Sequence, residues 1–166
     1  ARAAKVRLQA TGRKMRPVFE RVGLLYVRNV QENFANQAAP DGTPWQRLSA
    51  ATLLIGLSRK KRLKKSGYLG KKGKEWLQGK KILIESHDLI ESIKSQADAT
   101  SVTIGSDSGI KYAAIHQFGG PAGRGLKVTI PARPYLALND GKDSMKLADR
   151  DRKMILDVVE EELQKI

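Results

Sequence analysis

The sequence predicts an α+β fold: one domain over residues 1–166, in which a small antiparallel β-sheet packs against a long N-terminal helix and a C-terminal helix. Three observations predict it. Both ends of the chain carry apolar residues at helical spacing, the middle carries alternating strand patterns, and the length of 166 residues matches the usual size of about 100–200 residues per domain. No internal repeat and no Pro- or Ser-rich linker separates two halves, so an α+β single domain is expected.

The first element is a helix at about 14–36, with Pro17 tolerated in its first turn. Its apolar residues recur at steps of three and four: Met15, Val18, Phe19, Val22, Leu25, Tyr26, Val30 and Phe34. The basic residues before it are expected to form an arm or an N-terminal strand. Ser49 is predicted to cap a second helix over 50–63. Between these helices a dense turn signal spans 39–45, where Trp45 is expected to be buried.

Strand patterns follow at 92–97, 100–107 and 126–132, and together they predict the small antiparallel sheet. From about 143 to 166 a second apolar stripe predicts the C-terminal helix. Acidic residues crowd the end of that helix, which is unfavourable without a basic partner nearby. They are Asp157, Glu160, Glu161 and Glu162. We expect this end to meet the basic loop of the same chain or of a neighbouring copy.

The segment at about 59–81 holds eleven Lys or Arg residues, one acid and four glycines. Because glycines break helices and like charges repel, an extended, flexible basic loop is predicted. Two aromatic residues lie among the cations, a composition typical of single-stranded nucleic-acid platforms. A merely solvated loop is the alternative. The candidate contact residues for another subunit, a partner or DNA are Arg59, Lys60, Lys61, Arg62, Lys64, Lys65, Tyr68, Lys71, Lys72, Lys74, Trp76, Lys80 and Lys81.

The formal net charge of +14 favours an anionic partner such as nucleic acid, an acidic protein surface or a membrane headgroup layer. The absence of cysteine excludes disulfides and Cys-ligated zinc. No apolar run approaches the roughly 18 residues of a membrane span. A soluble protein made in a cytoplasm, without membrane contact, is expected.

Catalytic motifs are not apparent. A nucleophilic triad would need His87 or His116 as its base, yet no G-x-S-x-G elbow exists, and "GSDSG" at 105–109 fits a turn better. The glycine-rich stretch at 119–125 lacks the ending of a P-loop and is expected to form a hairpin-like or lid loop. No set of residues has metal-ligand spacing. We therefore expect no enzyme activity, no cofactor and no metal.

The stretch "YAAIHQFGG" at 112–120 predicts a short helix ended by Gly119 and Gly120. Tyr112, Ile115 and Phe118 are expected to share its buried side. His116 and Gln117 would then project sideways and bond backbone groups near "PARPYL", at 131–136. Arg133, between Pro131 and Pro134, is a further partner at that corner. This pattern favours a structural or subunit-contact role for His116 over catalysis.

Four blocks occur in a characteristic order: "PDGTPWQRL" at 40–48, "LIESHDLIESI" at 83–93, "YAAIHQFG" at 112–119 and "IPARPYL" at 130–136. In this order they resemble the phage virion morphogenesis or tail-completion family of Mu-like and P2-like phages and prophages. The family often has glycine where this chain has His87, which makes the turn there uncertain. The residues that carry the motif are Trp45, Tyr112, His116, Gln117, Phe118, Gly119, Arg133, Pro134 and Tyr135.

The resemblance implies a structural protein of the head–tail junction, which acts in tail completion or neck assembly as a homo-oligomeric ring. Its partners would be copies of itself and neighbouring neck, connector or tail proteins, with non-specific contact to packaged DNA. It would reside in the virion, and in the host cytoplasm during assembly. Two other hypotheses are a nucleic-acid-binding module using 59–81 and a hydrolase using His116.

Overall fold

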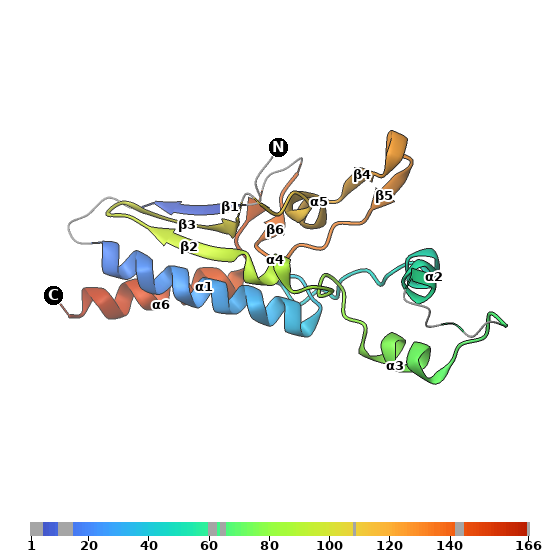
Figure 1. Cartoon of the computed structure of the whole chain (residues 1–166). Coiled ribbons are helices and arrows are strands. Elements are labelled where there is room, and N and C mark those ends of the chain that lie inside the picture. The colour runs from blue at the N-terminus through green and yellow to red at the C-terminus, as the bar shows by residue number, and fades with distance from the viewer. Residues whose placement is uncertain are drawn as a thin grey trace.

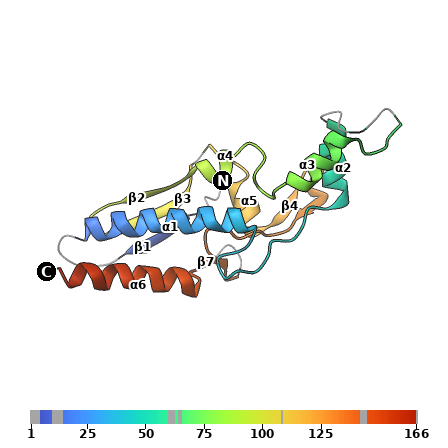
Figure 2. The ribbon, with the colours of Figure 1, turned by 90° about the horizontal axis from the view of Figure 1, so that it is seen from below.

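A computed structural model describes residues 5–9, 15–59, 63, 66–107, 109–141 and 145–165. Strands β1 (Lys5–Gln9), β3 (Ser101–Ser106) and β2 (Ile93–Ala97) form an antiparallel sheet in the order β1-β3-β2. Helices α1 (Arg16–Asn36) and α6 (Asp149–Leu163) lie side by side against it (Figures 1 and 2). The predicted arrangement of a small sheet with an N-terminal and a C-terminal helix is confirmed, and the N-terminal residues 5–9 supply a strand.

The core lies between α1 and the sheet. The helical stripe predicted for α1 is the buried face, with Val22, Tyr26, Val30 and Phe34 all at most 2% exposed. The sheet contributes Val102, Ile104 and Ile93 from the opposite side. Gly23 allows the two layers to approach closely, because a Cβ there would lie 2.7 Å from the Cβ of Ser95. The C-terminal helix adds Val158 to the same cluster.

Two of the four acids at the end of α6, Glu161 and Glu162, pair with a cation of α1. Arg21 Nη2 lies 2.6 Å from Glu161 Oε2, and Arg21 Nη1 lies 3.0 Å from Glu162 Oε1. Hydrogen bonds from Lys165 and then from Arg21 lower the pKa of Glu162. The expectation that the basic loop of the same chain compensates these two acids was therefore wrong. Arg21 of α1, which runs antiparallel to α6, supplies the positive charge instead.

Two short hairpins flank the sheet. The 126–132 pattern does form a strand, β5 (Val128–Ile130), but it pairs with β4 (Gly120–Ala122) and not with the main sheet. The 3₁₀ turn η1 (Arg124–Leu126) joins them, so the glycine-rich stretch forms the expected hairpin. Strands β6 (Leu138–Asn139) and β7 (Met145–Lys146) form the second hairpin before α6, which begins at Asp149 and not near 143.

Two further helices extend away from the sheet. Helix α2 (Ala50–Arg59) is capped by Ser49 as predicted, since Ser49 Oγ accepts a hydrogen bond from the Thr52 N–H at 3.2 Å. Residues 60–62 of the predicted helix lie outside the described residues. Helix α3 (Lys71–Gly79) lies within the segment predicted to be an extended loop. We call α2, α3 and the described residues between them the arm. The rest of the described chain is the body, from which the arm projects (Figures 1 and 2).

The helix in the arm corrects the prediction of a wholly extended 59–81 segment. Gly67 and Gly70 precede α3, so only Gly73 and Gly79 are within it, and each costs about 1 kcal/mol relative to alanine. The ring of Trp76 offsets this cost by packing over Gly56 of α2, where a Cβ would lie 2.5 Å from Trp76 Cη2. Glycine here enables a helix contact instead of preventing a helix.

Candidate functional site

The motif residues converge on one buried junction, which we call the joint: α5 (Ala113–Phe118), the segment 131–137 and Trp45. Gln117 is its centre and is fully buried. Its Oε1 accepts hydrogen bonds from the N–H groups of Tyr135 at 3.0 Å and Leu136 at 3.1 Å. Its Nε2 donates to Ala137 O at 2.7 Å and to Asn139 Oδ1 at 3.1 Å. The side-chain amide therefore bonds the backbone of residues 135–137 in the way that a neighbouring β-strand would, and so satisfies the polar groups of this buried segment.

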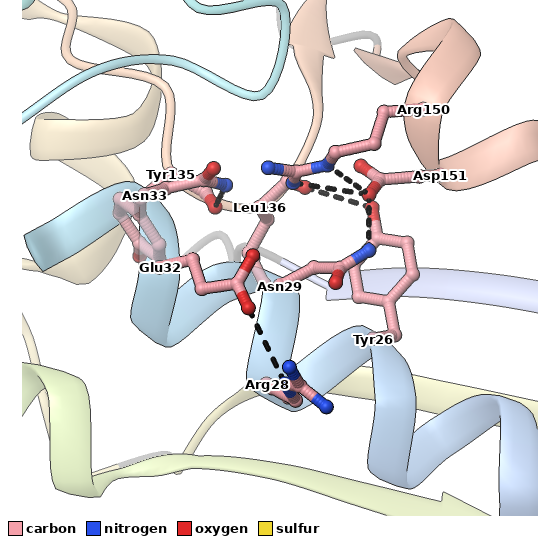
Figure 3. Close-up of polar contacts among 9 residues, drawn as sticks. All are labelled: Tyr26, Arg28, Asn29, Glu32, Asn33, Tyr135, Leu136, Arg150 and Asp151. Atoms are coloured by element: carbon pink, nitrogen blue, oxygen red, sulfur yellow. Dashed lines mark hydrogen bonds and ion pairs between the residues drawn. The ribbon is translucent and has the colours of Figure 1, made fainter. Parts of the chain in front are cut away.

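Helix α1 holds the same segment from the other side (Figure 3). Asn33 Nδ2 donates to Tyr135 O at 3.0 Å, and the Tyr26 hydroxyl donates to Leu136 O at 2.7 Å. Burial raises the pKa of Tyr26, and the nearby Asp151 raises it further, so the phenol stays a neutral donor. The joint is thus fixed to the core through backbone carbonyls.

Trp45 attaches the 39–45 loop to this junction, and its predicted burial is confirmed at 5% exposure. Its indole Nε1 donates to Pro134 O at 2.8 Å. Its ring meets Phe34 edge-on at 5.4 Å between centroids, and Phe34 contacts Tyr135 at 5.3 Å. Three segments far apart in the sequence therefore share one aromatic cluster.

His116 joins α5 to the 131–136 segment through its backbone, since its carbonyl accepts the Arg133 N–H at 2.7 Å. Its ring packs edge-on against Tyr112, with 5.7 Å between centroids. Burial lowers the pKa of His116, and the charge of Arg133 lowers it further, so the imidazole is neutral at pH 7. Within the described chain, its buried Nδ1 has no hydrogen-bond partner.

This environment is unlike that of a catalytic histidine. No hydrogen bond in the described ranges joins the imidazole to a hydroxyl or carboxylate, the partners that a triad requires. No group of three or more His, Asp or Glu side chains among the described residues could hold a metal ion. The chemistry that the joint offers is hydrogen bonding and charge, without an evident nucleophile.

The predicted buried face of α5 was wrong. The buried side chains are Ala113 and Gln117, whereas Tyr112 is 42% exposed and Ile115 and Phe118 are half-buried. The spacing rule assumes that apolar residues go inside, but an amide whose four hydrogen bonds are all satisfied can be buried as well. The predicted stop is present: Gly119 has φ 74°, and a Cβ there would lie 2.7 Å from the Ala132 nitrogen.

Five predicted contact residues, namely Lys60, Lys61, Arg62, Lys64 and Lys65, lie outside the described residues, and Arg59 ends α2. The other cations of the set are distributed over the arm and its return to the body. Lys71, Lys72, Lys74 and Lys81 are exposed, and Lys80 forms an ion pair with Glu85. Tyr68 is 76% exposed. Trp76 is half-buried over Gly56, with Lys80 Nζ 5.5 Å from its ring centroid, so it does not present a free stacking face.

A polar cluster between α1 and α6 was not predicted. Asp151 is 1% exposed, and its Oδ1 accepts from Asn29 Nδ2 at 2.8 Å and from Arg150 Nε at 3.1 Å (Figure 3). A helical-spacing argument could have found Asn33, which follows Tyr26 and Val30 on the buried stripe. Nothing in the local pattern marks Asp151 as buried, because its partner Asn29 lies on another helix.

Comparison with known proteins identifies the family of the chain. The model of the phage virion morphogenesis family matches residues 2–164. This chain belongs to the phage virion morphogenesis family. It is also similar to Mu-like prophage FluMu G protein 2 of Haemophilus influenzae (strain ATCC 51907 / DSM 11121 / KW20 / Rd), with 45% identity over 67 residues. That match spans 40% of this chain and 47%, about half, of the relative's length. No solved structure matches the chain.

His87, the position at which the motif departs from the resemblance, adopts a left-handed backbone with φ 65°. Glycine reaches that conformation without steric cost, whereas a residue with a side chain is strained there. Among the helices in the described ranges, none has the length and apolar character of a membrane-spanning segment.

Proposed function

We propose that this phage morphogenesis protein is a non-catalytic structural component that assembles as a homo-oligomeric ring at the head–tail junction, where it completes the tail or neck and joins head to tail. The observation that carries the proposal is the arm. It projects from the body with Leu54, Ile55 and Tyr68 at least half exposed (Figure 1). Apolar side chains gathered on a projecting element are typical of a surface that another protein covers.

The charge of the chain supports a place beside DNA. The net charge is +14, and the exposed cations of α3 add to the basic run that precedes it. A ring at a junction would surround or adjoin the DNA channel, where such a field has an anionic partner. The contact would be non-specific, because phosphate neutralisation carries no sequence information.

A structural role also accounts for the motif. Gln117, Arg133 and Trp45 are used to fix backbone segments, and His116 is neutral and has no hydroxyl or carboxylate partner among the described residues. We therefore propose that the protein performs no catalysis and needs no cofactor. Its partners are further copies of this chain and neighbouring neck, connector or tail proteins in the virion, which it meets first in the host cytoplasm.

The second candidate is a nucleic-acid-binding module that uses the Arg59–Lys81 segment. Its support is the density of cations and the exposed Tyr68. Trp76 weakens it, because that ring is engaged between Gly56 and Lys80 and cannot stack freely on a base. A gel shift at low salt that collapses at moderate salt fits the junction protein, whereas sequence-selective binding that survives high salt fits the module.

The deciding experiment is negative-stain imaging of particles assembled without this protein. We expect full heads and finished tails that remain separate. Overlong tails would place the protein at tail termination, and normal joined particles would contradict the proposal. Native mass spectrometry of the purified protein tests the ring, for which one dominant closed oligomer is expected.

A further inference from the structure

A pocket of about 310 Å³ lies where the base of the arm meets the joint. Leu48, Leu83 and Leu89 give it apolar walls, while Arg133, His116 and Lys81 add cationic or hydrogen-bonding groups. Two acids also line this pocket: Glu85 pairs with Lys80, whereas Asp88, whose Oδ2 accepts a hydrogen bond from Ser86 Oγ at 2.6 Å, keeps its negative charge. Lys80, Lys81 and Arg133 outnumber these two acids, so the pocket combines apolar surface with a net positive charge.

Arg133 is the source of that charge. It is only 5% exposed, and its Nε donates to Gln46 O at 3.0 Å. None of the ion pairs in the described part of the chain includes Arg133. A buried guanidinium without a counterion is costly, and its pKa is lowered by that burial. Beside it, His116 Nδ1 is buried without a partner. A site of this kind is suited to an anion that arrives from outside.

The apolar walls of the pocket indicate which kind of molecule carries the anionic group that binds there. A DNA phosphate is hydrated and flanked by further phosphates, whereas a carboxylate on a protein helix can have an apolar neighbour. The outer face of α6 offers that combination. Leu156 is 60% exposed, and Glu160 follows it by four residues, on the same side of the helix. Unlike Glu161 and Glu162, which bind Arg21, neither Asp157 nor Glu160 is ion-paired within the described ranges.

We propose that α6 of a second copy docks at this pocket, with Glu160 directed at Arg133 and Lys81 and with Leu156 against the leucine walls. The inference rests on the proposed ring and names its interface. In Figures 1 and 2, α6 runs from the base of the body toward the C-terminus, away from α4 (Asp88–Glu91) and α5 at the pocket. Two different surfaces that match across copies form a head-to-tail contact, which closes into a ring when the rotation permits.

Charge reversal at exposed positions tests the contact without disturbing the core. Glu160→Lys changes the docking helix, and Lys81→Glu changes the pocket. We expect each variant to weaken self-association at least about tenfold, because each places like charges opposite one another. Asp140→Lys is the matched control, since it reverses another exposed acid, and it should assemble as the wild type does. The readout is the oligomer distribution by sedimentation velocity over a range of concentrations.

Mixing gives the sharper result. Equal amounts of Glu160→Lys and Lys81→Glu should recover part of the self-association, because each contact between unlike variants pairs opposite charges at positions 160 and 81, although Arg133 still repels a lysine at position 160. The double variant Glu160→Lys/Lys81→Glu should recover part of the assembly by itself, for the same reason. Arg133→Gln should lose assembly, and Arg133→Lys should keep part of it. If circular dichroism shows that Arg133→Gln does not fold, the Lys81 and Glu160 variants still test the contact between α6 and the pocket.

The outcomes separate this inference from the proposed function. Rings that persist in both single variants, or no recovery on mixing, would overturn the α6 contact and leave the ring standing. A wild-type protein that stays monomeric at every concentration would overturn both. Loss on single reversal with recovery on mixing is the expected result.

Discussion

The body and the arm are built on different principles. In the body, distant segments meet at buried side chains whose polar atoms are mostly paired, as Gln117 and Tyr26 show. In the arm, two short helices contact each other through Trp76 and Gly56 while apolar side chains such as Leu54 remain exposed. The difference shows that the chain stabilises its body internally but leaves apolar side chains of the arm exposed to solvent. The same chemical change should therefore have unequal effects in the two regions.

Replacing glutamine by leucine should give the largest difference in unfolding free energy between the body and the arm. Gln117→Leu removes four hydrogen bonds and leaves buried N–H groups of Tyr135 and Leu136 without an acceptor, so we expect a loss of about 4 kcal/mol in unfolding free energy. Gln78→Leu, at an exposed position of α3, should change it by less than about 0.5 kcal/mol. Urea denaturation followed by circular dichroism measures both. Similar losses in the two variants would contradict the division into body and arm.

Replacing glycine by alanine should give a smaller difference in unfolding free energy between the two regions. Both Gly119 and Gly67 have positive φ, which costs alanine about 1–2 kcal/mol. Gly119→Ala also brings its Cβ to within 2.7 Å of the Ala132 nitrogen in the joint, so we expect a total of about 3 kcal/mol. A Cβ at Gly67 meets nothing within 4 Å, so only the conformational cost of about 1 kcal/mol is expected. Thermal unfolding of the two variants checks the ratio.

His116 should give the body a pH dependence. Its pKa is lowered in the folded protein from the ordinary value of 6.5, so below pH 6.5 the unfolded chain binds a proton that the native state does not. Stability is then complete above pH 6.5 and falls as the pH drops toward the native pKa, by up to about 1.4 kcal/mol per pH unit. Hydrogen bonds lower the pKa values of Asp98 and Glu162, whose contributions are lost only below their ordinary values of 3.8 and 4.5.

The measurement is the unfolding free energy between pH 5 and 7. His116→Gln should flatten this slope, whereas His87→Asn should keep it, because Asn tolerates the left-handed backbone at that exposed position. A slope that disappears with His87 instead would show that the joint histidine is not the group that titrates.

Deleting Tyr68–Lys80 should have the smallest effect on the stability of the body. The deleted residues include α3 and contribute no side chain to the hydrophobic core of the body, so the main unfolding transition should shift by less than about 1 kcal/mol. Ring formation or docking onto partner particles should nevertheless weaken. A complementation assay measures that loss, and unchanged assembly by the shortened protein would remove the proposed role of the arm.

The sequence by itself determined much of the body. The apolar stripe of α1, the strand alternation in 92–97 and 100–107, and the glycines that end α5 are local patterns, and each produced the expected element. The burial of Trp45 and the bonding of Gln117 to the backbone near 131–136 also followed from residue type and position. The order of the motif blocks identified the family, which the match over 2–164 confirms.

Only the tertiary structure decided which distant groups meet. The α3 helix is stabilised by the contact of Trp76 with Gly56. Gln117 can be buried in α5 because backbone groups some twenty residues away bond its amide. Arg21 of α1 pairs with Glu161 at the acidic end of α6. The strand at 128–130 pairs with 120–122 in a hairpin of its own, whereas β1 pairs with β3 in the main sheet. Local patterns report what a segment favours by itself. They do not report long-range contacts. The free energy of such contacts offsets the cost of placing glycine in a helix or of burying an amide in the core.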